Sequence, residues 1–385
     1  MGLTCLVLFG GAEGAGYGLR EAGIDIVRCI EWDKDASATA VAAGFPSVRG
    51  DVRAPTLYRD LPPIDIVWSS PPCQDWSTAG KREGATGGRN GFPWQWLVID
   101  HLRRRGLGPR WLMVENVTGM LTHNGKACGK GCCQDPTKCA TAYWHEVVMR
   151  EARARFPWAD YRVLDAAAFG TPQFRRRVFL VAGPRPIPWP SPTHGPPTTQ
   201  VSMFGPGLKP YRTVRDALGL GGIVGSGLKG SEWPTDRAAP CIRDGNGTAG
   251  LYVRTEQRGA TATAITMPAP TVPTVGNQYL HEVDPGTRAA SEPERLDRPA
   301  PCVTGSEVKG SGENANPQKM QRASDALFLA TGRCRLTVRE CAALFDMPAD
   351  YPWQGTKTSK YRQIGNMVAW KCAAALGRAV KDADA

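Results

Sequence analysis

The sequence contains no apolar run that approaches the length of a membrane-spanning segment, and it does not open with a basic stretch followed by an apolar one. These absences disfavour a membrane protein and lead us to expect a soluble, cytoplasmic one. In that reducing compartment most of the 12 cysteines should be thiols. Histidine is also scarce, with 5 residues, none of them in the motifs 9–18, 71–74, 115–117, 173–177, 335–351 and 363–368 described below. A cysteine hydrolase, which needs a histidine beside its nucleophile, is therefore disfavoured.

Positive charge is in excess among the residues that are present. Lys and Arg total 47 against 36 Asp and Glu, which gives a net charge of +11 and a pI near 9.2. Such a balance suits a polyanionic partner such as nucleic acid, although a solvated basic surface fits the same numbers. With 385 residues, 42% of them apolar, the chain can form a large core and a second, smaller domain.

Short apolar runs alternate with helical patterns in the first 183 residues. This alternation predicts an α/β fold with a mostly parallel sheet covered on both faces. The predicted strands are 3–9, 24–30, 64–69, 111–115, 161–165 and 177–182, and the predicted helices between them are 34–43 and 94–105.

The composition changes at about Pro184, where Pro, Gly, Thr and Ser become frequent and helical patterns fade. Helical spacing returns at 337–344 and 368–380. We therefore predict a first domain over 1–183, an irregular, β-rich domain over 184–332, and a return of 333–385 to the first domain. A cleft between two such lobes is a common place for a ligand.

A glycine-rich turn, FGGAEGAGYG over 9–18, follows the first predicted strand. Glycines let a ligand approach the backbone, and the start of the following helix favours a negative group. Glu31 lies 20 residues after Gly11, at the end of the next strand, where an acid can hold ribose hydroxyls. The pattern indicates a nucleoside site, although a tight turn alone also explains the glycines.

Cys73 follows Pro71 and Pro72 at the end of the third long strand. The prolines stiffen the backbone and prevent a helix from starting, so they would present the thiol at the carboxyl edge of the sheet. A deprotonated thiol there is a good nucleophile. A buried cysteine beside a rigid turn is the alternative.

Two more charged motifs end or begin strands. Glu115 closes the fourth long strand on the same edge as Cys73, where it could exchange a proton or simply cap the next helix. Strand alternation places Arg175 and Arg177 on one face and Arg176 on the other. Two guanidiniums on one face suit a phosphate or a negatively charged oxygen, and a solvated basic edge is the alternative.

In this order and at strand ends, the motifs 71–74 (PPCQ), 115–117 (ENV) and 173–177 (QFRRR) resemble those of the DNA cytosine-5 methyltransferase family. Residues 335–351 and 363–368 are similar to the ninth and tenth motifs of that family, so the resemblance covers most of 1–183 and 333–380. It implies a Rossmann-like S-adenosylmethionine-dependent methyltransferase domain with a mixed, mostly parallel sheet. The smaller β-rich domain would then be the target-recognition domain.

The resemblance also implies a set of catalytic roles. Cys73 would attack C6 of a cytosine flipped out of double-stranded DNA. Glu115 would bind N3 and the amino group, and Arg177 would steady O2 and Cys73 with support from Arg175. The addition at C6 gives C5 the carbanion character that it needs to accept a methyl group.

The methyl donor implied is S-adenosylmethionine. Glu31 would bind its ribose, Trp32 would stack on the adenine, Asp51 would face the adenine amino group, and Asn366 would help close the methionine end. The full set that the resemblance assigns to the donor is Phe9, Gly11, Glu13, Gly14, Glu31, Trp32, Asp51, Val52, Pro71, Asn366 and Val368.

Four residues depart from the pattern of the family. Glu13 falls where Gly is usual, and Val7 falls where Asp is common. Met367 and Ala369 replace the usual Ala or Ser and the usual Pro of the tenth motif. An acid at 13 could pair with the amino group of the donor or weaken binding of its carboxylate. A variant that transfers another group from a modified donor therefore stays open.

Residues 122–143 hold a cluster of cysteines just after the Glu115 motif. Its four cysteines resemble a small zinc knuckle, and zinc would fold a loop too short for its own core. A structural zinc and free thiols fit the spacing about equally. The cluster consists of Cys128, Cys132, Cys133 and Cys139.

Two related functions remain as alternatives. One is an RNA cytosine-5 methyltransferase, against which the long insert over 184–332 argues. The other is a non-catalytic nucleic-acid-binding relative, against which the intact Cys73, Glu115 and Arg177 argue. We expect a monomer that acts on duplex DNA and has a cognate restriction endonuclease as a partner.

Overall fold

The computed structural model describes residues 2–72, 90–122, 136, 139–196, 207–213, 216–217 and 337–385, and the backbone of short strands at 223–226, 250–253 and 269–270. Cys73 lies outside these residues, as do Cys128, Cys132 and Cys133. Most of the predicted recognition domain, 184–332, also lies outside them.

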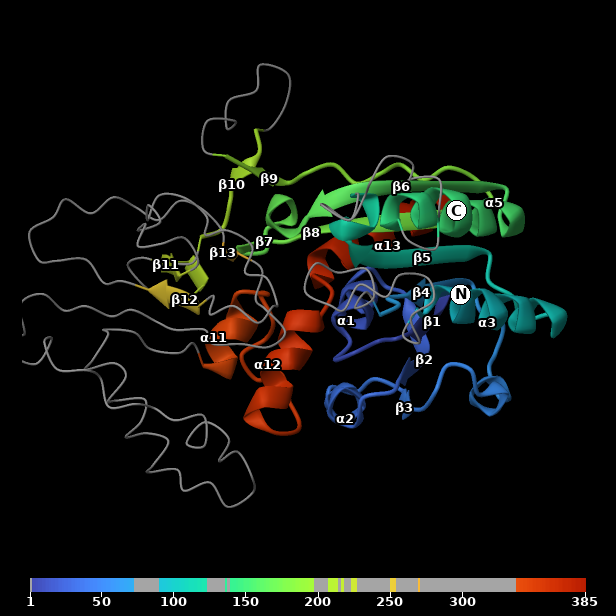
Figure 1. Cartoon of the computed structure of the whole chain (residues 1–385), viewed down its shortest axis with the longest axis horizontal. Coiled ribbons are helices and arrows are strands. Elements are labelled where there is room, and N and C mark those ends of the chain that lie inside the picture. The colour runs from blue at the N-terminus through green and yellow to red at the C-terminus, as the bar shows by residue number, and fades with distance from the viewer. Residues whose placement is uncertain are drawn as a thin grey trace, which may run out of the picture.

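A seven-stranded sheet forms the centre of the described structure (Figure 1). Its order is β3-β2-β1-β4-β5-β8-β6, with β3 to β5 parallel and β8 antiparallel to both of its neighbours. The predicted mixed, mostly parallel sheet is confirmed. The bounds are β1 Thr4–Leu8, β2 Asp25–Glu31, β3 Ser47–Arg49, β4 Ile66–Ser69, β5 Trp111–Val117, β6 Trp158–Asp165 and β8 Arg176–Gly183.

Helices cover both faces of this sheet, because alternate residues of each strand are apolar in both directions. On one face Val7, Trp68 and Met113 pack with α1 (Gly14–Glu21) and α13 (Trp370–Asp384). On the other face the partners are α3, α4, a π-helical turn and α5. These span Phe92–Arg104, Ala140–Tyr143, Trp144–Met149 and Arg150–Arg155. The α/β fold class is therefore confirmed.

The carboxyl-terminal segment packs against the amino-terminal half, where α13 shares a core with α1. Helix α11 (Val338–Ala343) and helix α12 (Lys357–Asn366) share a third apolar cluster and lie beside the end of the sheet that carries α2 (Lys34–Ala42) (Figure 1). Thr337 caps α11 with the reciprocal bonds to Glu340 that define a capping box. Cys341 is buried in this third cluster, and Cys5, Cys29 and Cys372 are buried in the core between the sheet, α1 and α13.

Short strand pairs make up the remaining regular structure. β7 (Gln173–Phe174) pairs with β13 (Ala269–Pro270), and β11 (Ile223–Ser226) pairs with β12 (Gly250–Val253). β9 (His194–Gly195) pairs with β10 (Lys209–Pro210). Among the helices of the described part, none combines the length and apolarity that crossing a bilayer requires.

Candidate active site

The carboxyl ends of the parallel strands meet at one edge of the sheet, and this edge carries the candidate site. The chain moves outward in one direction from β1 to β3 and in the other from β4 to β5, so the order reverses between β1 and β4. Ligands of open α/β sheets bind outside such a reversal point. The glycine-rich turn follows β1, and Pro71 follows β4.

The glycine-rich turn is built from left-handed backbone and is tied to β2. Phe9, Gly11 and Glu13 have φ values of 56°, 59° and 63°. The Gly10 amide donates to the Ile30 carbonyl at 3.3 Å, and the Gly11 amide donates to Glu31 Oε2 at 2.8 Å. Few side chains tolerate this conformation, which explains the glycine at position 11.

Glu31 is fixed by backbone amides on two sides. Its Oε2 accepts from Gly11, and its Oε1 accepts from the Asp33 amide at 2.7 Å. Burial raises the pKa of the Glu31 carboxyl, and the amide hydrogen bonds partly offset this rise. A carboxylate held in this way is able to accept hydrogen bonds from ribose hydroxyls.

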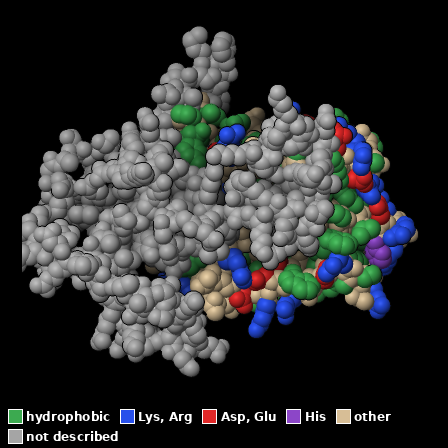
Figure 2. Space-filling view, in the orientation of Figure 1, with side chains coloured by type: hydrophobic (Ala, Val, Ile, Leu, Met, Phe, Trp, Pro, Cys, Tyr) green, Lys and Arg blue, Asp and Glu red, His purple; other side chains and the backbone are tan. Residues whose placement is uncertain are grey.

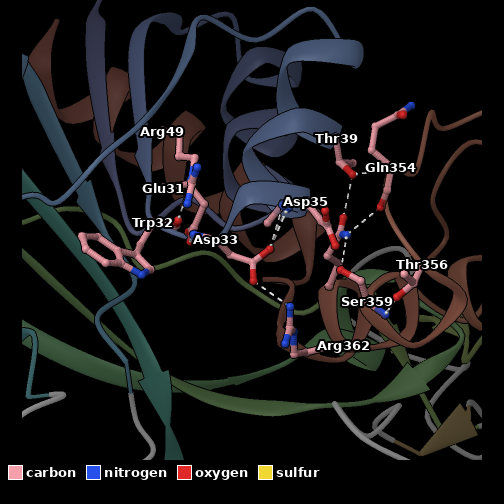
Figure 3. Close-up of polar contacts among 12 residues, drawn as sticks. Glu31, Trp32, Asp33, Asp35, Thr39, Arg49, Gln354, Thr356, Ser359 and Arg362 are labelled. Atoms are coloured by element: carbon pink, nitrogen blue, oxygen red, sulfur yellow. Dashed lines mark hydrogen bonds and ion pairs between the residues drawn. The ribbon is translucent and has the colours of Figure 1, made fainter. Parts of the chain in front are cut away.

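Trp32 and Arg49 line a small open pocket next to Glu31, together with Gly50 (Figure 3). The Trp32 side chain is 67% exposed, and an indole so open offers a face for an adenine base. An aromatic face beside a ribose-binding acid fits a nucleoside. The residues present therefore fit the adenosine part of S-adenosylmethionine.

Asp51 and Val52 follow β3 but make contacts of their own. Asp51 forms an ion pair with Arg53, whose Nε lies 2.8 Å from Oδ2 and 2.9 Å from Oδ1, and this lowers the pKa of the Asp51 carboxyl. Val52 is buried, and its carbonyl accepts from Tyr58 at 2.6 Å. An adenine amino group would have to share Asp51 with Arg53.

The tenth-motif segment packs directly on the glycine-rich turn. A Cβ at Gly14 would lie 2.3 Å from Met367 Cγ and 2.4 Å from the Val368 carbonyl oxygen. Glycine is therefore required at 14 for this close approach. Asn366 is exposed at the end of α12, and Val368 is buried beside the turn, so the predicted donor residues from both ends of the chain meet here.

Glu13 is placed differently from our expectation. Its side chain is completely buried, with no exposed surface to meet the amino or carboxylate group of a donor. The left-handed backbone at φ 63° turns it beneath the glycine-rich turn, against α1. A contact between its side chain and the donor is therefore not supported.

Glu115 and Arg177 form the charged pair of the site. The Arg177 Nε lies 3.2 Å from Glu115 Oε1, and the two side chains are only 14% and 10% exposed. Burial raises the pKa of the Glu115 carboxyl, while the charges of Arg177 and Arg175 oppose that rise. The alternative reading of Glu115 as a helix cap is wrong, because it lies inside β5 and Val117 begins the next turn.

Arg175 links the strands that carry Glu115 and Arg177 to the tenth-motif segment. It is almost completely buried, and its Nη2 donates to the carbonyls of Gly365 at 3.0 Å and Met367 at 2.9 Å. Arg176 is exposed, as strand alternation predicts. Arg175 thus holds the tenth-motif backbone on the side of the sheet where Glu115 lies.

The chain that leads to Cys73 is anchored at this edge, although Cys73 itself is outside the described residues. The Asn116 side chain donates to the Pro71 carbonyl at 3.1 Å. A Cβ at Gly91 would lie 2.9 Å from Pro71 and 2.8 Å from Pro72, so the chain leaves the described structure and re-enters it at nearly the same place.

A polar network that the sequence did not predict joins α2 and α12 (Figure 3). The Thr39 hydroxyl donates to Gln363 at 2.7 Å, and Arg362 donates to Asp33 at 2.6 Å. Asp33 also caps α2 by accepting from the amides of Asp35 and Ala36. An Asp directly before a helical pattern was a detectable capping signal, but its partner 329 residues away was not.

One of the four candidate zinc ligands, Cys139, lies in the described structure. It is completely buried at the start of α4. No cluster of three or more metal-binding side chains occurs among the residues that could be searched, which exclude the other three cysteines.

The family model of C-5 cytosine-specific DNA methylases matches residues 3–203 and 269–382. This is most of the chain, and it includes every described element of the site. The chain therefore belongs to this family of DNA cytosine-5 methyltransferases.

Individual relatives agree with this assignment. The type II methyltransferase M.AquIA of Picosynechococcus is 35% identical over 235 residues, which cover 55% of this chain and 86% of the relative. M2.BsuMI of Bacillus subtilis is 34% identical over 178 residues, but the match covers only 40% of that relative. M.Eco47II of Escherichia coli is 25% identical over 405 residues, covering 98% of this chain and 78% of the relative.

Solved structures show the same fold at low identity. A protein described as a prophage-encoded DNA modification methyltransferase (E. coli) aligns over 99% of both chains, with a TM-score of 0.53 and 16% identity. A variant of Spodoptera frugiperda DNMT2 aligns over 97% of this chain and 98% of its own, with a TM-score of 0.52 and 14% identity.

Proposed function

We propose that this chain transfers a methyl group from S-adenosylmethionine to C5 of a cytosine in double-stranded DNA, using Cys73, Glu115 and Arg177. The observation that carries the proposal is the buried Glu115–Arg177 pair at 3.2 Å, on the sheet edge that also carries Pro71, Glu31 and Trp32. An acid, a cation and a nucleoside pocket on one edge fit this reaction and few others.

The residues of this chain would activate the cytosine. Thiolate addition by Cys73 at C6 forms a carbon–sulfur bond and moves electron density toward C5 and N3. Glu115, whose pKa burial raises, can hold a proton and share it with N3 as negative charge develops there. Arg177 can stabilise O2 in the same step. After transfer, loss of the C5 proton to a base expels the thiolate.

The donor would lie across β1 and β2. When bound, S-adenosylmethionine supplies the electrophilic methyl group. Glu31 would hold the ribose hydroxyls and Trp32 would offer its face to the adenine, while the backbone of Gly11 and Gly14 would permit close approach. Asn366 and Val368 would close the site from the tenth motif.

Recognition of the target sequence would belong to residues 184–332. In support of this assignment, the family model leaves 204–268 unmatched, so the sequence of this segment is not shared with the family as a whole. On the described part of the face in Figure 2, Lys and Arg alternate with Asp and Glu. The target base must be extruded from the duplex before Cys73 can reach C6.

The direct test is bisulfite sequencing of DNA from a host that has no cytosine methylation of its own. Expression of the wild-type protein should protect cytosines in one short sequence context, and Cys73→Ala should protect none. Purified protein with labelled donor should label duplex DNA and leave transfer RNA unlabelled. Absence of protected cytosines in the wild type, or labelling of RNA alone, would contradict the proposal.

Three finer assignments belong to the same proposal. We infer that the protein is a monomer, which light scattering in solution can check. A cognate restriction endonuclease predicts that DNA from the expressing host resists one specific nuclease. A structural zinc in 122–143 predicts about one equivalent of zinc in purified protein, and less than about a tenth of an equivalent would exclude it.

A further inference from the structure

Glu13 is a completely buried carboxyl group to which the reaction assigns no role. Its Oε1 lies 1.8 Å from the Cβ that an alanine at Gly10 would carry, and its Oε2 lies 2.3 Å from such a Cβ at Gly16. The ring of Phe45 borders the same space, 3.0 Å from the Gly16 Cβ position. The carboxyl therefore occupies a closed space between the glycine-rich turn and α1, and both glycines leave it room.

The surroundings of Glu13 favour its neutral form. Neither of its oxygens accepts a hydrogen bond from a nitrogen or oxygen of the described residues. The Arg20 guanidinium, which could have paired with it, stacks on Phe45 and donates to the Gly44 carbonyl. Burial raises the pKa of the Glu13 carboxyl to about 8.

Other titratable groups face Glu13 from each neighbouring element. The Cys29 thiol interacts with the carboxyl and lowers its pKa, whereas the charge of Glu31 raises it. Tyr351, whose hydroxyl donates to the Ala12 carbonyl at 2.5 Å, is also close enough to feel the charge of Glu13. Among the described residues, the titratable groups that interact with Glu13 are Cys5 from β1, Cys29 and Glu31 from β2, Arg20 from α1, and Tyr351 from the segment before α12.

The backbone of Glu13 has a conformation that glycine normally adopts. At φ 63° and ψ 36° it closes the turn, since its amide donates to the Gly10 carbonyl and its own carbonyl accepts from the Tyr17 amide in the first turn of α1. A side chain other than glycine is strained there unless its surroundings hold it in place. Here the enclosure of the carboxyl group keeps the backbone of Glu13 in this conformation.

We propose that Glu13 is a positioning residue for the methyl donor: while its side chain fills this closed space, the turn presents the backbone of Gly11 and Gly14 to the donor. This inference rests on the proposed function, since it concerns the same donor site. Its consequence is that donor binding depends on the protonation of Glu13. Once ionised, the carboxylate makes no ion pair with any described residue, because Arg20 is held on Phe45 and the Gly44 carbonyl. It must therefore move, which disturbs the turn.

The test is the affinity for S-adenosylmethionine without DNA, measured by calorimetry from pH 6.5 to 9.5 in the wild type and in Glu13→Gln. Above pH 8 the wild-type Kd should rise by up to about tenfold per pH unit more than that of the variant. The amino group of the donor titrates in the same range, but it does so equally with both proteins. Equal pH profiles for the two proteins overturn the inference.

Two further variants separate positioning from general stability. Cys29→Ala removes a thiol that lowers the pKa of Glu13, so the rise in Kd should move to higher pH. This holds even if Glu13→Gln fails to fold. Leu19→Ala makes a cavity in α1, in the same core, and should leave the pH at which Kd rises unchanged. A shift with Leu19→Ala, or none with Cys29→Ala, contradicts the inference.

The outcome also separates this inference from the proposed function. A wild-type protein that methylates DNA but shows no dependence on Glu13 overturns only the inference. A protein that binds the donor with the expected pH dependence but leaves cytosines unmodified overturns only the proposed function. A wild-type protein that binds no S-adenosylmethionine overturns both.

Discussion

The two halves of the site hold their acids in different ways. On the donor side, the Glu31 carboxylate accepts from two backbone amides, those of Gly11 and Asp33. On the cytosine side, Glu115 faces the side chain of Arg177 at 3.2 Å. Burial raises the pKa of both carboxyls, but backbone hydrogen bonds oppose the rise for Glu31 and guanidinium charges oppose it for Glu115.

This difference follows from what each half has to do. Backbone amides are fixed by the fold, so they suit a binding site whose shape must stay constant. An arginine side chain leaves the proton affinity of its partner adjustable, which suits a group that exchanges a proton during the reaction. The comparison predicts that substitutions on the cytosine side affect the rate and those on the donor side affect binding.

The largest expected effect belongs to Glu115→Gln. The amide keeps the size of the side chain but cannot hold and return a proton, so kcat should fall by about 10²- to 10⁴-fold. Single-turnover methylation of duplex DNA measures this loss, and calorimetry of donor binding serves as the control. A variant that loses donor affinity and keeps its rate would contradict the assignment of Glu115 to the catalytic side.

Arg177→Ala should lower kcat by about 10²- to 10³-fold, because charge that develops on the cytosine loses its cation. It should also change the pH dependence. Arg177 lowers the pKa of Glu115, so its removal raises that pKa further, and the alkaline limb of the kcat profile should move to higher pH. An alkaline limb that stays at the same pH or moves to lower pH would show that Glu115 is not the titrating acid.

Glu31→Gln removes the charge that accepts hydrogen bonds on the donor side. Hydrogen bonds to charged groups contribute about 1.5–3 kcal/mol, so the KM for the donor should rise by about 10- to 100-fold. Steady-state kinetics with varied donor will show whether KM changes more than kcat. A larger change in kcat would place Glu31 on the catalytic side of the comparison.

Glu13, on the donor side, should make the free energy of unfolding of the protein depend on pH. Its folded pKa of about 8 lies above the ordinary 4.5, so the folded state binds the extra proton, and the stabilisation is lost as pH rises from about 4.5 to 8. The free energy of unfolding of the wild type should fall relative to Glu13→Gln by about 1.4 kcal/mol per pH unit in that range. Urea denaturation at several pH values measures the difference, and parallel curves would contradict it.

The smallest effect is expected where α2 meets α12. Thr39→Val removes a buried hydroxyl that donates to Gln363 at 2.7 Å and accepts from the Gln354 amide at 2.8 Å, which should cost about 1–3 kcal/mol of stability. Ser37→Ala, on the same helix but bonded to Ser47, is the matched control and should cost less. Equal losses of stability in urea denaturation would show that the hydrogen bonds of Thr39 contribute no more than the bond between Ser37 and Ser47.

Much of the fold could be read from the sequence, because buried parallel strands are short apolar runs. β1, β2 and β4 begin one or two residues from their predicted starts. β3 was missed because it has only three residues and an exposed pattern. α12 was missed because its buried face includes Ser359, Gln363 and Gly365, which give no apolar periodicity.

The site was predictable where chemistry coincides with strand ends. Glu31, Glu115 and Arg177 lie at the sheet edge where the motifs placed them. The direction of the Glu13 side chain was not predictable, because it depends on a left-handed backbone that the sequence of a glycine-rich turn does not reveal. The Arg53 partner of Asp51 was close in sequence, but an exposed ion pair leaves no pattern.

The packing of Met367 and Val368 on Gly14 also bears on the order in which the protein is synthesised. Ribosomes release the glycine-rich turn early, and the segment that closes it emerges only after the whole middle of the chain. A chain that stops before that segment has Glu31 but lacks the packing of Met367 and Val368 on the turn. That packing can therefore form only after the region we assign to DNA recognition has been translated.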